Sequence, residues 1–227
     1  MNLSKPTSFI LLTLSALLTA CSTAPKEKMP TIEELLKRPQ AAKPQVAVVP
    51  TADGRKGGVL PVLSAVNSKG KVHGAVCREA SVDKALCEMA LAQKRPGKYK
   101  PAQVCTEESD GEGNRLKVCE NVPSYAEHIY LLYGKEDNYQ GGAYRMEQPH
   151  YPALSLENGE EGEVQLAVVV APEGGLDSVK IVKSSRYRRL DNAADKHIKQ
   201  SIFLPKVING EPVWTQFNVP IHYQIPN

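Results

Sequence analysis

The chain has 227 residues, of which 41% are hydrophobic and 23% charged. This balance is typical of globular proteins and excludes collagen-like, wholly disordered and multi-pass membrane proteins. The 28 Lys and Arg residues stand against 25 Asp and Glu residues. A net charge this small is not that of a nucleic-acid binder, so no nucleic acid is expected as a partner. Five cysteines are present, an odd number that leaves at least one outside any intramolecular disulfide.

The N-terminus predicts export. Lys5 precedes an apolar run at residues 9–20, which is too short to span a hydrocarbon core of roughly 30 Å but suits a signal peptide. The run ends Leu18-Thr19-Ala20-Cys21 and resembles the bacterial lipobox. This resemblance implies cleavage of residues 1–20 and a lipidated Cys21, with palmitate-type acyl chains, at the mature N-terminus. The alternative is a single-spanning anchor.

The same resemblance implies where the protein is located. Ser22 favours sorting to the outer membrane. We therefore expect a lipid-anchored lipoprotein of the Gram-negative cell envelope that faces the periplasm. Two or more acyl chains make attachment to a membrane stable, since each buried methylene contributes about 0.8 kcal/mol.

With Cys21 lipidated, four cysteines remain in an oxidising compartment, which predicts two disulfides. We favour Cys77–Cys87 and Cys105–Cys119, although four cysteines allow three pairings. Zinc is the competing interpretation, but the cysteine spacings lack the close pairs of structural zinc sites. No metal and no other cofactor is expected.

Residues 21–61 are rich in Pro, Ala and Lys and predict an extended tether, with one short helical island at residues 31–36. Residues 62–140 predict a cysteine-containing accessory domain. It holds a helix at 81–92 capped by Ser81, a hairpin about the turn-rich segment 108–114, and a second helix at 125–133.

The C-terminal residues have the clearest periodicity. Apolar residues alternate through 164–170, and a Gly-rich turn leads into a second strand at 176–184, which predicts a hairpin. A single apolar face follows over residues 190–202, as in an amphipathic helix. Alternation over 213–225 predicts a long last strand, and Pro220 indicates a sheet edge because proline cannot donate to a central ladder. Such an edge is either blunted or a template for another strand.

Residues 141–227 resemble the C-terminal domain of the TonB energy-transducer family. The segment Gln148-Pro149-His150-Tyr151-Pro152 is similar to the family's Gln-Pro-x-Tyr-Pro motif, and Asn209-Gly210-Glu211-Pro212 with Val219-Pro220-Ile221 is similar to its closing strand. The resemblance implies an α+β domain with a three-stranded antiparallel sheet and two helices. A small disulfide-containing α+β segment would precede it.

The resemblance also implies a function, the addition of a peptide strand to the last strand of the domain. The peptide is the TonB box of an outer-membrane TonB-dependent transporter, or a segment of another envelope protein. The resemblance makes Gln148 a candidate contact, and on the last strand we expect backbone groups and polar side chains to contribute. The predicted partner-binding residues there are Thr215, Gln216, Phe217, Asn218, Val219, His222 and Tyr223.

The chain departs from the family in its N-terminus, because its only apolar run is the cleavable one and contains no histidine. We therefore expect an accessory to transmembrane transport. The alternative is a structural envelope lipoprotein that binds peptidoglycan or holds an assembly. An enzyme is not expected, because the five histidines are scattered and no hydrolase, zinc-protease or phosphate-loop motif occurs.

Overall fold

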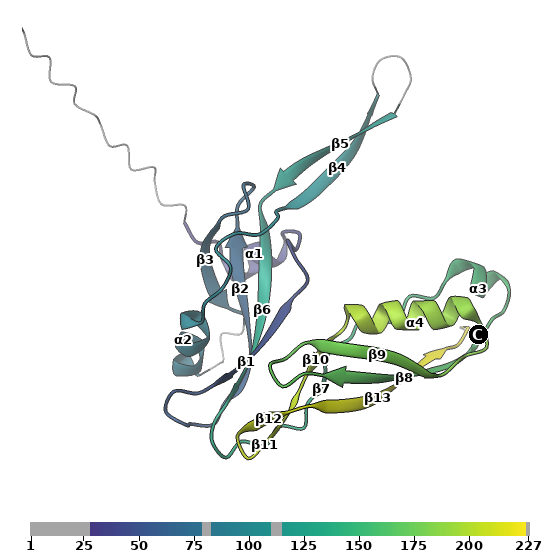
Figure 1. The fold of residues 1–227 in the computed structure, drawn as a ribbon. Helices are drawn as coiled ribbons and strands as arrows, with labels where there is room; N and C mark the ends of the chain where they lie inside the picture. Colours follow the sequence, from purple (N-terminus) through teal and green to yellow (C-terminus); the bar gives the residue numbers. More distant parts are fainter. Residues whose placement is uncertain (1–27, 79–82, 110–114, 226–227) are drawn as a thin grey trace, which may run out of the picture.

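The computed structural model describes residues 28–78, 83–109 and 115–225. The predicted lipidation site Cys21 and the predicted helix cap Ser81 lie outside these residues. The described chain forms an N-terminal region built on a four-stranded sheet and a C-terminal region built on a three-stranded sheet (Figure 1). Within these ranges, no helix combines the length and the apolar character needed to cross a bilayer.

The N-terminal sheet has the order β1-β6-β2-β3. Strand β1 (Gln45–Pro50) runs parallel to β6 (Ser124–Tyr133), and the other neighbours, β2 (Gly58–Val66) and β3 (Val72–Cys77), pair antiparallel. Most of the predicted tether at 21–61 is therefore folded from residue 28 onward. The four-residue apolar run that begins at Val46 pairs with β6 along its length. This pairing stabilises a strand in a segment whose prolines had predicted an unpaired tether.

Pro61 lies inside β2 without interrupting the sheet. Its carbonyl accepts a hydrogen bond from the Arg78 N–H just beyond the end of β3, at 2.8 Å. In an antiparallel strand the N–H and C=O of one residue point to the same side. The missing N–H of Pro61 is therefore on the β3 side, so the ladder to β6 is intact.

The predicted helical island is confirmed as α1 (Ile32–Leu36). Thr31 caps it in a capping box, in which the Thr31 hydroxyl accepts from the Glu34 N–H and the Glu34 carboxylate accepts from the Thr31 N–H. A helix this short is marginal alone. It persists because Leu35 is fully buried in a cluster with Leu63 and Ala65 of β2.

The helix predicted at 125–133 is wrong, because this segment is β6, the strand between β1 and β2. Its residues are buried on both faces of the sheet. Tyr130 and Leu132 pack toward α2 (Lys84–Ala92), whereas Ile129 and Leu131 pack toward the C-terminal region. A strand buried on both faces is a near-continuous apolar run, and periodicity does not separate such a run from a helix.

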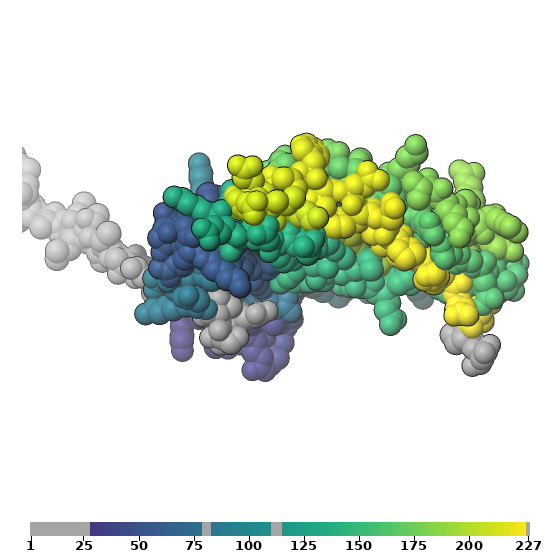
Figure 2. Space-filling view, turned by 90° about the horizontal axis from the view of Figure 1, so that it is seen from below, coloured from purple at the N-terminus to yellow at the C-terminus, as the bar shows by residue number. Residues whose placement is uncertain are grey.

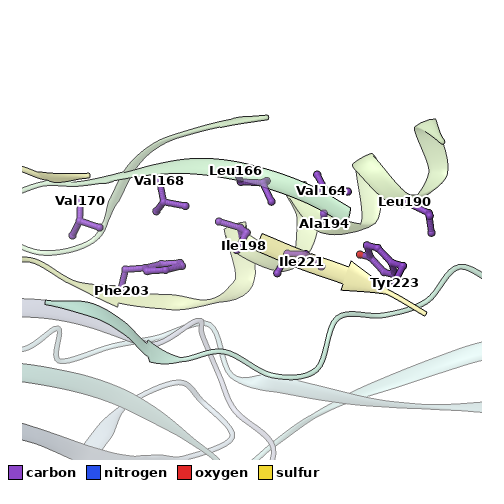
Figure 3. Close-up of a cluster of buried hydrophobic side chains, with 10 residues drawn as sticks. All are labelled: Val164, Leu166, Val168, Val170, Leu190, Ala194, Ile198, Phe203, Ile221 and Tyr223. Atoms are coloured by element: carbon purple, nitrogen blue, oxygen red, sulfur yellow. The ribbon is translucent and has the colours of Figure 1, made fainter. Parts of the chain in front are cut away.

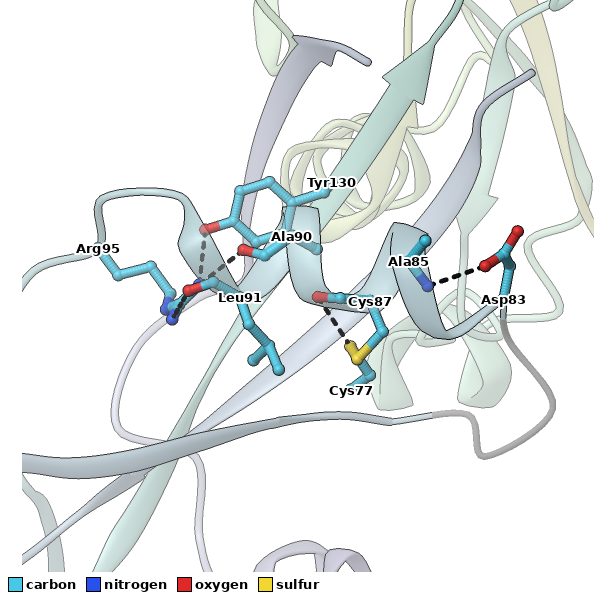
Figure 4. Close-up of a disulfide and its surroundings, with 8 residues drawn as sticks. All are labelled: Cys77, Asp83, Ala85, Cys87, Ala90, Leu91, Arg95 and Tyr130. Carbon is cyan, nitrogen blue, oxygen red and sulfur yellow. Dashed lines mark hydrogen bonds between the residues drawn. A yellow bond between two sulfur atoms is a disulfide. The ribbon is translucent and has the colours of Figure 1, made fainter. Parts of the chain in front are cut away.

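The helix predicted at 81–92 is confirmed as α2, which starts at Lys84 (Figure 4). The Asp83 carboxylate accepts a hydrogen bond from the Ala85 N–H at 2.8 Å and caps the helix. The predicted disulfide Cys77–Cys87 is also confirmed and ties α2 to the end of β3. At the other end, the Arg95 guanidinium donates to the carbonyls of the last helical turn.

The predicted hairpin is confirmed as β4 (Ala102–Ser109) and β5 (Arg115–Val122). Cys105 lies directly opposite Cys119 in the register, and the two form the predicted second disulfide with their Cα atoms 4.0 Å apart. This two-stranded ribbon extends beyond the N-terminal sheet (Figure 1).

The C-terminal sheet has the order β13-β8-β9, with β8 (Gly162–Val170) in the centre, β9 (Leu176–Lys183) and β13 (Thr215–Tyr223). Helix α4 (Arg188–Gln200) packs on one face of it, and α3 (Ala153–Glu157) precedes it. The core side chains point from β8, β13 and α4 into the space between helix and sheet (Figure 3). The predicted α+β domain with three antiparallel strands and two helices is confirmed.

Short strands connect the two regions. Strand β7 (Gly142–Arg145) pairs with β10 (Ile202–Leu204), and β11 (Lys206–Ile208) pairs with β12 (Glu211–Val213). Apolar side chains of β6, β10 and β11 form one cluster, against which β1 also packs. The two regions therefore share a core.

A buried ion pair reinforces this connection. Glu127 of β6 is almost fully buried, and its carboxylate accepts two hydrogen bonds from the Arg145 guanidinium of β7 at 2.6 and 2.8 Å. Arg78 adds a third at 3.2 Å. Burial alone would raise the pKa of Glu127, but the two arginines outweigh it and hold the pKa below its usual value.

Candidate strand-addition site

The last strand, β13, lies at the edge of the C-terminal sheet. It pairs with β8 over its nine residues, from Thr215↔Val170 to Tyr223↔Gly162. On its other side it pairs with no strand in the described part of the chain. Seen from below, β13 lies on the molecular surface (yellow in Figure 2). An edge of nine residues, roughly 30 Å long, has room for an added strand.

The side chains of β13 alternate between core and solvent. The predicted contacts Gln216, Asn218 and His222 are exposed. The other four predicted residues face the core, and their side chains are buried or half-buried: Thr215, Phe217, Val219 and Tyr223. The side chains of these four residues therefore belong to the core of the domain, and only the three exposed residues offer side chains to an incoming strand.

The two ends of β13 are fixed by internal contacts. The Thr215 hydroxyl accepts a hydrogen bond from the Lys206 N–H and donates to the Val213 carbonyl, at 2.8 and 2.9 Å. The Tyr223 ring packs edge-on against the Tyr151 ring, with 5.3 Å between centroids. Burial raises the pKa of Tyr223 to about 12, so its hydroxyl is neutral at physiological pH.

Pro220 lies within the paired part of β13, opposite Gln165. Alternate residues of a strand point their N–H groups to the same side. Because a proline is tolerated where its missing N–H would face the open side of an edge strand, we infer that Gln216, Asn218 and His222 point their backbone groups to that open edge. These are the residues with exposed side chains.

One charged group borders the exposed face. His222 lies with its Nδ1 3.6 Å from the Glu163 carboxylate on β8. Hydrogen bonds from Gln165 and Lys183 to that carboxylate lower the pKa of Glu163. The exposed face of β13 is therefore mostly neutral and polar.

Gln148 occupies a different place from the other predicted residues. It is exposed and lines a groove of about 420 Å³ between residues 145–150 and the C-terminal half of α4, with Gln40 and Pro44 at the rim. No hydrogen bond or ring contact among the described residues joins Gln148 to β13. The motif that contains it acts structurally through Tyr151, which contacts Tyr223, and Pro152, which is the N-cap residue of α3.

The groove also contains a buried imidazole. His197 of α4 is 7% exposed, and its Nε2 has no hydrogen-bond partner among the described residues. Burial lowers the pKa of His197, while Glu147 opposes the shift.

Trp214 is a candidate contact that the sequence prediction did not include. It directly precedes β13 and its side chain is 61% exposed. Tryptophan is enriched among residues that dominate binding energies. Its position next to a predicted edge strand in an otherwise polar face is the signal that identifies it.

Among residues 28–78, 83–109 and 115–225, no three His, Cys, Asp or Glu side chains are grouped so that they would hold a metal ion.

The comparisons with known proteins concern the C-terminal region. A family model described as the C-terminal of the Gram-negative bacterial TonB protein matches residues 147–225. The protein TonB of Neisseria gonorrhoeae is 46% identical over 78 residues, which are 34% of this chain and 25% of that protein. The protein tonB2 of Pseudomonas aeruginosa is 37% identical over 79 residues, 34% of this chain and 28% of that protein.

Two solved structures are also similar. The TonB CTD of Pseudomonas aeruginosa is 23% identical and aligns over 40% of this chain and 92% of that one, with a TM-score of 0.34. The TonB CTD of Helicobacter pylori is 30% identical over 34% of this chain and 80% of that one, with a TM-score of 0.27. The chain spans about a quarter of the length of the first curated relatives that it matches.

Proposed function

Residues 147–225 belong to the TonB C-terminal domain family, and from this premise we propose that the protein binds a peptide segment of an outer-membrane transporter by strand addition to β13. The peptide is the TonB box of a TonB-dependent transporter. The protein acts as an accessory in TonB-type transport and not as an enzyme. Another envelope protein with a similar extended segment is an equivalent partner for this chemistry.

The observation that carries the proposal is the open nine-residue edge of β13. In strand addition, main-chain hydrogen bonds provide affinity and alternate side chains provide specificity. The exposed residues Gln216, Asn218 and His222 supply the side chains, and Trp214 supplies an aromatic surface at the start of the edge.

The second part of the proposal is a lipid anchor at the N-terminus. Cleavage after residue 20 and lipidation of Cys21 would attach the chain to the outer membrane with its folded regions in the periplasm. Metabolic labelling with a radioactive palmitate tests this step. We expect label in the wild-type protein and none in Cys21→Ala, and an unlabelled wild-type protein would contradict it.

Isothermal titration calorimetry with a synthetic TonB-box peptide tests strand addition. The key comparison is between two variants at one position, Asn218→Pro and Asn218→Ala. The proline removes the backbone N–H that we place at the open edge, so we expect at least a tenfold loss of affinity. The alanine keeps that N–H, and we expect a loss of no more than about threefold. Circular dichroism controls for folding.

Two outcomes contradict the proposal. If Asn218→Pro binds the peptide as tightly as the wild type, the edge of β13 is not the site. If the wild type binds no TonB-box peptide and instead is retained on purified peptidoglycan, the alternative of a structural envelope lipoprotein is favoured.

A further inference from the structure

The ribbon of β4 and β5 is the part of the protein that the proposed function does not use. It extends from the N-terminal sheet away from the C-terminal region (Figure 1). Almost all of its 16 strand residues are exposed. Its strands pair only with each other in the described chain. The ribbon therefore has two exposed faces and two open edges.

A ribbon of this kind needs a covalent cross-link to remain folded. An isolated two-stranded hairpin is at best marginally stable in water. The Cys105–Cys119 disulfide crosses the middle of the ribbon and closes a loop with a sequence separation of 14. In the chain-entropy model, a cross-link that closes a loop of this length stabilises the folded state by about 3 kcal/mol, because it lowers the entropy of the unfolded chain. The disulfide thus preserves a projecting shape that no core supports.

The two faces of the ribbon differ in how their side chains are used. On the disulfide face, two polar contacts flank the Cys105–Cys119 bridge within the ribbon. The Gln103 amide donates to Asn121 at 3.1 Å, and Arg115 pairs with the Glu107 carboxylate at 3.4 Å. Four of the polar side chains on this face are therefore paired within the ribbon.

The opposite face contains the unused groups. The register places Val104, Leu116 and Val118 on it, and these side chains are 51%, 52% and 37% exposed. The carboxylates of Glu108 and Glu120 lie on the same face, at its two ends, and form no ion pair within the described residues. The face is an apolar strip bordered by two unpaired anionic groups.

We propose that this strip, Val104, Leu116 and Val118 with Glu108 and Glu120, is a docking surface for a second protein partner, distinct from the partner of β13. The partner presents an apolar strip bordered by Lys or Arg side chains. Charge complementarity supports this chemistry, because the paired residues of β4 and β5 place two carboxylates, Glu108 and Glu120, and no Lys or Arg on this face. Complementary charges at the rim speed encounter and fix register.

The same charge disfavours two other occupants. Anionic lipid headgroups repel an acidic ribbon. A second copy of the ribbon, paired edge to edge, would bring like charges together. A basic protein surface would meet neither of these electrostatic repulsions.

The ribbon is joined directly to a central strand of the core. Strand β5 continues through Pro123 into β6, the strand that packs against both the N-terminal helix α2 and the C-terminal region. A partner bound to the ribbon would therefore be connected to β13 through the shared core.

Photo-crosslinking in cells tests the proposal on the full-length protein. The photoreactive residue p-benzoylphenylalanine is placed at Val104 or Val118 on the apolar face, and at Gln103 or Asn121 on the disulfide face as matched controls. We expect one discrete crosslinked protein from the first two positions and none from the controls. Glu108→Lys combined with Glu120→Lys should reduce the crosslink at least tenfold.

Two further measurements complete the test. Charge reversal of basic residues on the captured protein should restore the crosslink to the double Lys variant. Binding of the TonB-box peptide should be unchanged in that variant, which shows that the fold and the β13 site are intact and separates this proposal from the function of β13. Equal crosslinking from both faces, crosslinks only to lipid or to a second copy, or a yield insensitive to charge reversal would overturn it.

Discussion

The C-terminal and N-terminal sheets differ in what surrounds them. In the C-terminal sheet, α4 covers one face and the other is exposed, so β8 and β13 alternate between buried and partly exposed side chains. In the N-terminal sheet, β6 is buried on both faces, by α2 on one and by β10 and β11 on the other. The comparison teaches that hydrophobic alternation reveals a strand only where one face contacts water. It also shows that the central strand of one region is part of the core of the other.

The largest expected effect tests this shared core. Leu131→Ala removes a 2% exposed side chain from the cluster between the regions, and we expect a loss of about 3 to 4 kcal/mol of unfolding free energy. Hydrogen exchange should then accelerate in both sheets together. Val182→Ala, at a 54% exposed position of β9, is the control, with an effect below about 0.5 kcal/mol. Faster exchange in the N-terminal sheet alone would show that the regions are independent.

The buried ion pair is the next test. Glu127→Ala leaves two arginines without their partner, and breaking a buried pair costs about 3 to 5 kcal/mol. Arg145 and Arg78 are each about one third exposed, so water hydrates them when Glu127 is removed and the cost is smaller. We expect the variant to lose about 2 to 3 kcal/mol of unfolding free energy, measured by urea unfolding.

The same group predicts a pH dependence. The pKa of Glu127 is lowered in the folded state, so its contribution is complete above its unfolded pKa of about 4.3 and is lost as the pH falls through the folded value. The stability difference between wild type and Glu127→Ala should therefore shrink below about pH 4. A difference that grows on acidification would contradict this assignment.

The two disulfides should contribute differently to stability, because one is part of a core and the other is part of the projecting ribbon. Replacing Cys77 and Cys87 with Ser detaches α2 from β3, and we expect a loss of about 2 kcal/mol in global stability. Replacing Cys105 and Cys119 with Ser should leave global stability within about 0.5 kcal/mol, since the ribbon has no core, while protease cleavage within 102–122 increases. Equal global losses would remove the distinction.

The smallest expected effect concerns the β11–β12 turn. Asn209 has a positive φ of 49° and precedes Gly210, whose φ is 75°. Asn209→Ala should cost about 1 kcal/mol in thermal unfolding, because a Cβ disfavours this conformation and alanine lacks the local hydrogen bonding of asparagine. Asn209→Gly should recover most of the loss. No recovery would assign the effect to the contact of Asn209 with Asn138 instead.

Particular residues explain what the sequence predicted. The hairpin, helix α4 and last strand follow from amphipathic patterns and from the Gly-containing turns between them. Pro220 indicated the edge position of β13, whereas Pro61 lies in β2, a strand with a neighbour on each side, just beyond the end of its pairing with β3. The Cys105–Cys119 disulfide follows from a hairpin symmetry that the register confirms, and Cys77–Cys87 follows as the remaining pair. The α+β fold of the C-terminal domain was therefore predictable residue by residue.

Other features depend on long-range pairing that no local pattern contains. Val46 to Val49 form β1 only because β6 lies beside them, some 80 residues later in the chain. Glu127 is a polar residue within an apolar segment, and its partner Arg145 lies on another strand. At the candidate site, exposure of Gln216, Asn218 and His222 was predictable from alternation, whereas the groove beside Gln148 depends on α4 and on residues 40–44.

The packing of Met29 against the cluster around Leu35 also limits how far the folded regions can lie from a lipid anchor. A lipid on Cys21, as proposed above, would lie eight residues from Met29, and a fully extended chain of that length spans at most about 29 Å. A tether of 40 residues would have spanned about 140 Å. The folded body would therefore remain close to the leaflet that holds its acyl chains. Transporters in that same membrane would be accessible to it without any long search across the periplasm.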